Sequence, residues 1–266
     1  MTSRKVDLTS VPNFRDLGTL PVAGGTFRTG VVYRSTDLAG LSDADLPRYL
    51  ELGVQTVFDL RTAAERAQAP DRLTSGEKEV ALDVLADSVN DAAASITTLL
   101  DDPSQAEKLL ANGRSVNLMI DSYRNIITLP SALTSYQAFF NDLADPAREG
   151  AALFHCTTGK DRTGWAAASL LSLLGADHAT IYADYLETNT DLAPATEPVL
   201  KQAEAKGISR SALEPVLGVR REYLDTAFQQ VDDTFGSMDA YFHDGLGLTD
   251  ELEGALRARF VVAASS

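Results

Sequence analysis

The sequence is poor in three features, and each absence excludes a class of protein. It holds a single cysteine, Cys156, so an intramolecular disulfide cannot form. A reducing compartment is the simplest expectation for such a protein. It has no apolar run of about 18 residues, and its longest candidate, 165–176, is too short for a bilayer and contains serines. Its first residues lack the apolar stretch of a signal peptide. We expect a protein without an integral membrane segment, either cytoplasmic or secreted without a recognisable signal peptide.

Basic residues are also scarce. The 266 residues include 23 Lys and Arg against 38 Asp and Glu, for a net charge of −15. A surface this acidic offers no field of cations to displace counterions, which argues against binding to nucleic acid or to an anionic membrane. Any anion that the protein binds must be met by a small local group of donors. The hydrophobic content of 44% is that of an ordinary globular chain.

Short apolar and β-branched runs alternate with helical patterns. The predicted strands are 29–35, 54–60, 79–84 and 151–154. Between the first two strands, Ser42 and Asp45 form a capping signal for a helix that ends near Gly53, and Thr62 with Glu65 repeats the signal after the second strand. The residues before Gly30 indicate irregular structure with a short hairpin. This alternation predicts an α/β fold, a central and mainly parallel sheet flanked by helices.

Two longer stretches read as helical but are interrupted. Residues 87–110 are alanine-rich and acidic, with Pro103 inside them. Residues 180–231 hold several amphipathic segments, which we expect to be separated at Pro194, Pro198, Gly207 and Pro215. The pattern from 219 onward is helical and closes with 248–260. We predict one domain over 1–266, with a helical lid inserted within 180–231.

The stretch 154–164, FHCTTGKDRTG, carries the chemistry. It places Cys156 after a strand, with five residues between it and Arg162, which begins a helix. Backbone N–H groups at a helix N-terminus stabilise a thiolate and also fit the oxygens of a phosphate. Gly159 can take a positive φ and so turn the amides inward. Arg162 can grip two phosphoryl oxygens with its planar fork, and the Thr163 hydroxyl can stabilise the thiolate when it leaves. The sequence predicts Cys156 as a nucleophile and Arg162 as its phosphate-binding partner.

These residues resemble the Cys-x5-Arg protein tyrosine phosphatase superfamily, and HCTTGKDRTG is similar to its bacterial, mycobacterial-type branch of tyrosine, dual-specificity and lipid phosphatases. The similarity extends to 13–18 (NFRDLG), 33–35 (YRS), 58–61 (FDLR) and a late pattern from Tyr223 to Leu248, although 87–115 matches weakly. The resemblance implies a tyrosine-phosphatase-like fold, a phosphocysteine intermediate, a helical lid and catalysis without a metal or cofactor.

A carboxylic acid must also protonate the leaving oxygen. Asp161, beside Arg162 in the loop, is favoured, since the resembled branch carries an aspartate there and geometry near the scissile bond comes before pKa. Asp59, at the end of a central strand, is the competitor; it could instead lead a helix or pair with Arg61. Lys160 adds positive charge for a phosphate. The predicted substrate-binding residues are Thr157, Thr158, Gly159, Lys160, Thr163, Gly164 and Asp59.

Other polar residues have structural interpretations. His155 should point away from Cys156 and hydrogen-bond the loop backbone, because side chains alternate along a strand. His178 and His243 show no metal-ligand spacing, so no metal site is expected. We predict that Asn13, Arg15 and Asp16 lie behind the loop as scaffold, with direct substrate contact as the alternative.

Several functions compete for this loop. A Walker-type nucleotide loop is excluded, because Phe154 stands where its first glycine belongs. A rhodanese-like sulfurtransferase has a shorter loop without the Arg-Thr-Gly ending, and a phosphate-recognition module without turnover usually lacks the cysteine, the arginine or the acid. A phosphomonoester hydrolase acting on phosphorylated protein is therefore favoured, with phosphoinositides as the alternative substrates. Phosphotyrosine and phosphoserine or phosphothreonine both fit the loop.

Overall fold

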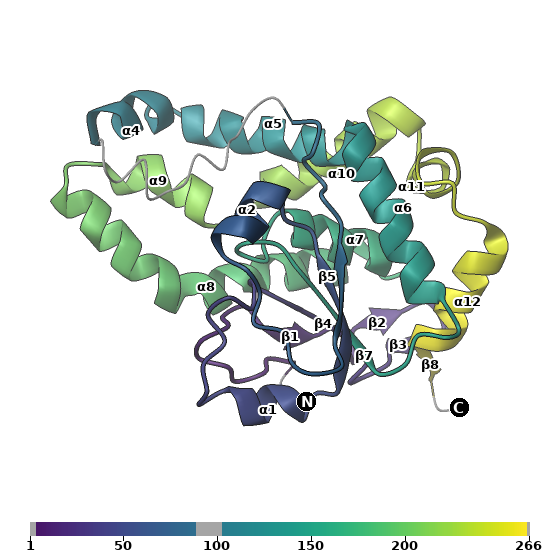
Figure 1. Cartoon of the computed structure of the whole chain (residues 1–266). Helices are drawn as coiled ribbons and strands as arrows, with labels where there is room; N and C mark the ends of the chain where they lie inside the picture. The colour runs from purple at the N-terminus through teal and green to yellow at the C-terminus, as the bar shows by residue number, and fades with distance from the viewer. Residues whose placement is uncertain (1–3, 89–102, 265–266) are drawn as a thin grey trace.

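The computed structural model describes residues 4–88 and 103–264 (Figure 1). The strands are β1 (Arg15–Asp16), β2 (Pro21–Val22), β3 (Gly25–Phe27), β4 (Val32–Ser35), β5 (Val54–Asp59), β6 (Lys78–Ala81), β7 (Ala151–His155) and β8 (Val261–Ala263). The helices are α1 (Leu46–Leu50), α2 (Ala63–Gln68), α4 (Pro103–Leu110), α5 (Arg114–Thr128), α6 (Pro130–Ala144), α7 (Arg162–Leu173), α8 (His178–Ala205), α9 (Arg210–Leu217), α10 (Arg221–Phe235), α11 (Met238–Ala240) and α12 (Asp250–Phe260), with a π-helical segment η1 (Tyr241–Gly245). Among the described residues, no helix is both long and apolar enough to cross a membrane.

Five strands form the central sheet in the order β1-β4-β7-β5-β6. Every neighbouring pair is parallel except β1 with β4, so the predicted fold class is confirmed. The central strand, β7, is buried along its whole length, as expected for a strand covered on both faces. His155 is in register with both Ser35 and Asp59, so β4, β7 and β5 end at the same level. In parallel sheets this carboxyl edge is where ligands bind.

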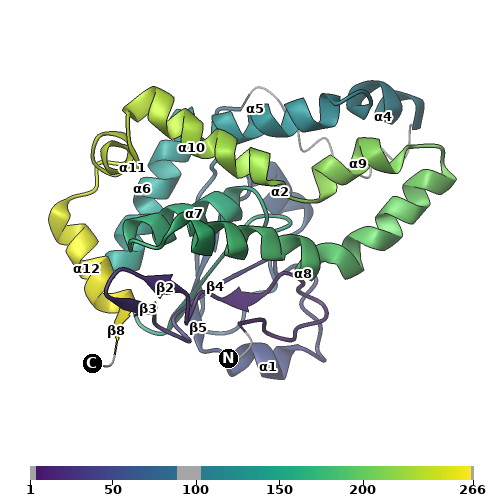
Figure 2. The ribbon, with the colours of Figure 1, turned by 180° about the vertical axis from the view of Figure 1, so that it is seen from behind.

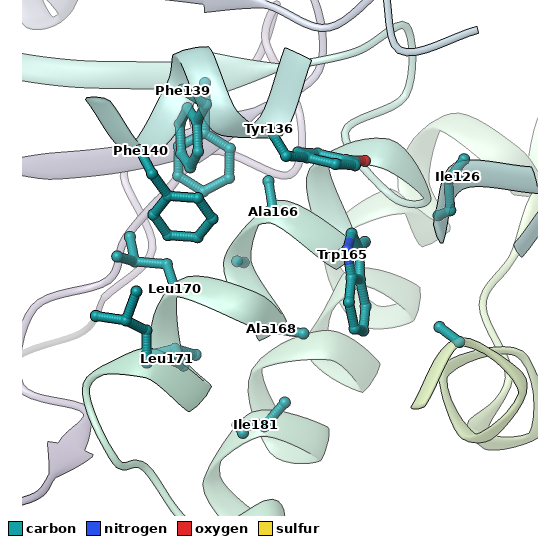
Figure 3. Close-up of a cluster of buried hydrophobic side chains, with 14 of the residues drawn as sticks. Ile126, Tyr136, Phe139, Phe140, Trp165, Ala166, Ala168, Leu170, Leu171 and Ile181 are labelled. Atoms are coloured by element: carbon teal, nitrogen blue, oxygen red, sulfur yellow. The ribbon is translucent and has the colours of Figure 1, made fainter. Parts of the chain in front are cut away.

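The sheet separates two hydrophobic cores, because successive residues of β7 face opposite sides. Phe154 packs into the larger core with helices that include α6, α7 and α8, whereas Leu153 packs into a smaller core with Tyr49 of α1. Figure 3 shows the larger core, where Trp165 of α7 lies fully buried. Its labelled members include Tyr136, Phe139 and Phe140 from α6 and Ala166, Leu170 and Leu171 from α7. These contacts fix α7, and thus the loop before it, against the sheet.

The predicted N-terminal hairpin is confirmed as β2 and β3, and β8 pairs with β3 to complete a second, three-stranded sheet. Phe27 stacks on Phe260 there, with ring centroids 5.5 Å apart. The predicted strands and helices differ from the structure mainly at their ends. The expected capping contact is present, since the Asp45 N–H donates to the Ser42 hydroxyl at 3.2 Å, but residues 43–45 form a turn and α1 itself begins at Leu46.

The helices within 178–217 extend beyond the sheet (Figure 2). A third hydrophobic cluster joins α4, the second half of α8 and α9, with members Ala106, Leu110, Leu200, Ala203, Ile208, Ala212, Leu213 and Leu217. The break expected in 180–205 is wrong: α8 runs unbroken through Pro194 and Pro198. Both prolines lie on the exposed side, where water can solvate the carbonyls that lose an N–H partner, while the buried side packs on the cluster. Pro215 likewise lies inside α9.

The lid stays a prediction; in that range the structure has α8, α9 and most of α10. Of the interrupted stretch 87–110, residues 89–102 lie outside the described part, and α4 begins at Pro103. Proline suits the first turn of a helix, where its missing N–H has no partner to lose.

Candidate active site

The catalytic candidate is the loop from Cys156 to Asp161, which joins β7 to α7 at the carboxyl edge of the sheet. Gly159 has φ +65°, and a Cβ at this position would meet the Ser35 carbonyl oxygen at 2.0 Å. Only glycine therefore fits both the backbone conformation and the close approach to β4. The expected role of Gly159 as the turning point of the loop agrees with this geometry.

The carbonyl groups of the loop are drawn to one side by the N-terminal part of the chain. Asn13 Nδ2 donates to the carbonyls of Thr158 and Gly159, at 3.2 and 3.0 Å, and Arg34 Nη2 donates to the Gly159 carbonyl at 2.9 Å. In a trans peptide the N–H points opposite to the carbonyl, so the N–H groups that follow turn toward the other side. N–H groups turned to one side can hold an anion, and this candidate anion cradle has Asn13 behind it, as predicted.

Arg15 and Asp16 also lie behind the site rather than in it. Arg15 is fully buried and donates to Asp184 of α8, with Nε 3.0 Å from Oδ1. Asp16 accepts from the backbone N–H groups of Gly18 and Gly30, each at 2.7 Å. These contacts match the predicted scaffold role.

Cys156 is almost completely buried, with 2% of its surface exposed. The preceding residue, His155, is held from both ring nitrogens: Nδ1 donates to the Cys156 carbonyl at 3.2 Å, and Nε2 lies 3.0 Å from Asp71 Oδ2. Burial alone would lower the pKa of His155, but the Asp71 hydrogen bond and charge outweigh it and raise that pKa. The ring thus supports the backbone of the loop at the cysteine, as predicted.

Arg162 is bound end-on by a carboxylate that the sequence did not single out for this role. Its Nη1 and Nη2 each lie 2.7 Å from one oxygen of Glu65, and Nη1 also donates to the Leu60 carbonyl at 3.3 Å. Burial would raise the pKa of Glu65, but the hydrogen bonds and charge of Arg162 dominate and lower it to about 2. This pair fixes the guanidinium plane, which leaves its Nε edge for a ligand.

Glu65 is positioned by its own helix. The predicted capping box is confirmed: Glu65 N–H donates to Thr62 Oγ1 at 3.2 Å, and Thr62 N–H donates to Glu65 Oε2 at 2.8 Å. Thr157 of the loop adds a hydrogen bond from its hydroxyl to Oε1 at 2.6 Å. The capping signal was visible in the sequence, but the contact with Arg162, 97 residues away, was not.

Asp161 and Lys160 form an ion pair beside the cradle. Lys160 Nζ lies 2.7 Å from Asp161 Oδ2, and Tyr123 of α5 donates its hydroxyl proton to Oδ1 at 2.9 Å. The Asp161 side chain keeps 21% of its surface exposed, so a bound ester can reach it. Tyr123 gave no sequence signal, because nothing in the pattern of α5 distinguishes it from an ordinary core tyrosine.

Asp59 lies elsewhere. It is fully buried and accepts hydrogen bonds from three groups of Arg61: the backbone N–H and Nε, each at 2.9 Å, and Nη2 at 2.7 Å. Asp71 completes this group, 2.9 Å from Arg61 Nη2. Asp59, Asp71 and His155 lie close enough together to hold a metal, but Arg61 already supplies their positive charge, so the donor set is that of an ion-pair network.

The last two predicted residues start α7. Thr163 is buried, and its hydroxyl has no hydrogen-bond partner among the described residues. Gly164 lets α7 pack closely on α8, because a Cβ there would lie 3.1 Å from the Tyr185 ring. The structure thus gathers the predicted loop residues into one site and leaves Asp59 beneath it.

Known proteins match most of the chain. The model of the tyrosine phosphatase family matches residues 6–262. A Cupriavidus necator protein named as a tyrosine-protein phosphatase is 34% identical over 241 residues, which cover 89% of this chain and 82% of that protein. The triple specificity protein phosphatase PtpB of Mycobacterium tuberculosis is 32% identical over 263 residues, 87% of this chain and 90% of that protein. The chain therefore belongs to the tyrosine phosphatase family.

Proposed function

We propose that Cys156 attacks the phosphorus of a phosphomonoester and forms a phosphocysteine, while Asp161 donates a proton to the leaving oxygen. In the second step Asp161 accepts a proton from a water molecule, the water oxygen attacks phosphorus, and the sulfur leaves as a thiolate. The buried Thr163 hydroxyl, which lacks a partner among the described residues, would donate to that thiolate. No step of this reaction requires a metal ion or a redox partner.

The observation that carries this proposal is the geometry of the loop. Its carbonyls are held outward by Asn13 and Arg34, while Glu65 fixes Arg162 at the other end of the same loop. The inward N–H groups and the guanidinium would stabilise both the thiolate and the charge on the phosphoryl oxygens. The sulfurtransferase alternative finds no support, since the whole pattern from 6 to 262 is that of a phosphatase family.

The geometry favours Asp161 over Asp59 as the general acid. Asp161 belongs to the loop and keeps part of its side chain exposed, whereas Asp59 is fully buried and bound by Arg61. A carboxyl that holds an arginine within the protein cannot also meet a leaving group at the surface of the cradle. No contact among the described residues supports the expected role of Asp59 in substrate binding, because its carboxylate is fully buried and bound by Arg61.

For the substrate we propose phosphotyrosine in proteins, with phosphoserine and phosphothreonine as further substrates. The mycobacterial relative is named for triple specificity, which supports a broad range. Lys160, buried beside Asp161, favours a second candidate, a phosphoinositide that carries an additional phosphate. The net charge of −15 opposes that candidate at an anionic membrane surface. The single cysteine supports action in a reducing compartment.

Two variants test the mechanism. Cys156→Ser should abolish turnover while phosphate or vanadate still binds, because the cradle stays intact; retained turnover would refute the nucleophile. Asp161→Asn should slow esters with poor leaving groups far more than p-nitrophenyl phosphate, whose leaving group needs little protonation. An equal loss on both esters would remove Asp161 as the acid.

Turnover should then be compared on a phosphotyrosine peptide, a phosphoserine peptide and a soluble inositol phosphate. Preference for the phosphotyrosine peptide supports the proposed substrate. Preference for the inositol phosphate would replace it with the lipid alternative.

A further inference from the structure

Asp161 is held by two different parts of the molecule. Nζ of Lys160, its neighbour in the loop, lies 2.7 Å from Oδ2 and donates to Oδ1 at 2.9 Å. Oδ1 accepts a hydrogen bond of 2.9 Å from Tyr123, which comes from the middle of α5, 38 residues earlier. One contact therefore belongs to the loop itself, and the other belongs to the helices that cover the carboxyl edge of the sheet.

A second tyrosine stands behind the first. Tyr185 of α8 has its hydroxyl oxygen 2.6 Å from that of Tyr123. A tyrosine has one hydroxyl proton, and Tyr123 donates its proton to Asp161, so Tyr185 must be the donor to Tyr123. Burial is the main reason that the pKa of each tyrosine is raised above its ordinary value, and both hydroxyls stay protonated at neutral pH. The result is a directed chain from Tyr185 through Tyr123 to Asp161.

The rings of this chain cannot swing away without disturbing the core. Tyr123 is fully buried and meets Tyr185 edge-on, with ring centroids 6.3 Å apart. The Tyr223 ring of α10 also packs on Tyr123, with ring centroids 5.7 Å apart. The Tyr123 hydroxyl therefore has a fixed position, and its hydrogen bond restricts the rotation of the Asp161 side chain.

We propose that Tyr123, supported by Tyr185, is a positioning residue for the general acid. The inference rests on the proposed role of Asp161. The hydrogen bond from Tyr123 to Oδ1 ties Asp161 to a buried side chain outside the loop and so fixes the carboxyl plane relative to the cradle. Because Tyr123 and Tyr185 come from α5 and α8, Asp161 is held in this orientation only when both helices pack beside the loop.

The test replaces Tyr123 with Phe, which keeps the ring and removes the donor. For phenyl phosphate, whose phenolate is a poor leaving group, kcat should fall about tenfold while KM stays within about twofold. For p-nitrophenyl phosphate, kcat should fall less than about threefold, which also shows that the variant is folded. Tyr185→Phe should give a smaller loss with the same dependence on leaving group.

The matched control is Tyr223→Phe. Tyr223 belongs to the same ring cluster, but its hydroxyl donates to the Pro215 carbonyl at 3.0 Å and does not reach Asp161. Its removal should leave the ratio of the two esters unchanged. If Tyr223→Phe shifts that ratio as much as Tyr123→Phe does, packing of the cluster explains the effect and the proposal is wrong.

The double variant Tyr123→Phe with Asp161→Asn separates this inference from the mechanism beneath it. If Tyr123 acts through Asp161, its replacement should cost nothing further once Asp161 is gone, so the two losses on phenyl phosphate should not add. Fully additive losses would overturn the positioning role. If Asp161→Asn instead lowered kcat equally on phenyl phosphate and p-nitrophenyl phosphate, Asp161 would not be the general acid. The positioning role of Tyr123 would then fall as well.

Discussion

The loop proposed as catalytic is held from two sides by carboxylates, and the two sides differ in what the carboxylate contacts. On one side Glu65 contacts Arg162, the residue proposed to bind phosphate, and retains 16% exposure of its side chain. On the other side Asp184 of α8 is fully buried and contacts Arg15 and Arg34. Asp184 reaches the loop indirectly, through Arg34, which donates to the Gly159 carbonyl, and through Arg15, which holds Asn13.

This difference predicts a division of effects. A carboxylate that orients a ligand-binding guanidinium should matter more for turnover than for folding. A carboxylate that neutralises two buried guanidinium groups should matter more for folding, because an uncompensated buried charge is costly. The variants below are ordered from the largest expected effect to the smallest.

Asp184→Asn should cause the largest loss of stability. The amide keeps the shape of the side chain but leaves Arg15 and Arg34 buried without their shared anion. We expect the free energy of unfolding to fall by about 3–5 kcal/mol, measured by urea denaturation. At a temperature where the variant is folded, kcat/KM should stay within about tenfold of the wild type.

Glu187→Gln is the control for this variant. Glu187 lies one turn further along α8, is one-third exposed and contacts Arg4. We expect a change below about 1 kcal/mol. If Glu187→Gln lowered the free energy of unfolding as much as Asp184→Asn does, removal of any charge from α8 would destabilise the protein. The loss in Asp184→Asn could then not be assigned to Arg15 and Arg34.

Glu65→Gln should show the opposite division. Glutamine can keep the capping box with Thr62, but it cannot neutralise Arg162. We expect kcat/KM on p-nitrophenyl phosphate to fall by about 10–100-fold, since a guanidinium that loses its bidentate partner loses its fixed orientation. Thr62→Ala weakens the cap and keeps the ion pair, so it should cost about 1 kcal/mol of stability and leave kcat/KM within about threefold. A comparable activity loss in both variants would assign the effect to α2 rather than to Arg162.

Acid should weaken the Glu65 side in a measurable way. The folded-state pKa of about 2 lies below the ordinary value of 4.5, so the ion pair adds stability above about pH 5 and loses it as the pH falls toward 2. Between about pH 6 and pH 3, the difference in unfolding free energy between wild type and Glu65→Gln should narrow by about 1–2 kcal/mol. If this difference did not change with pH, Arg162 would not lower the pKa of Glu65 in the folded protein.

Arg4→Ala should have the smallest effect. Arg4 meets Asp184 at 2.8 Å from the surface side, with 15% of its side chain exposed. Asp184 keeps its two buried partners in this variant, so we expect a stability loss of about 1 kcal/mol and kcat/KM within about twofold. A loss as large as that of Asp184→Asn would make Arg4, rather than Arg15 and Arg34, the main partner of the cluster.

The sequence could predict the arrangement at the centre of the candidate site because that centre is local. Cys156, Gly159 and Arg162 belong to one strand–loop–helix unit, and short-range rules of strand pattern, glycine conformation and helix start describe it. The parallel sheet followed from the alternation of strands and helices. The expected break at Pro194 failed because the local rule ignores what the opposite side of α8 packs against.

The sequence by itself determined which atoms are present for chemistry: one thiol, one arginine at the proper spacing, and an acid beside it. Only the tertiary structure decided which other groups reach them, because Glu65, Tyr123 and Asp184 meet the loop or its supports across 38 to 150 residues of chain. The physical reason is that a capping glutamate, a core tyrosine and a buried aspartate look ordinary within their own segments. Their contacts arise when the carboxyl ends of the strands and the covering helices are brought together by burial of the core.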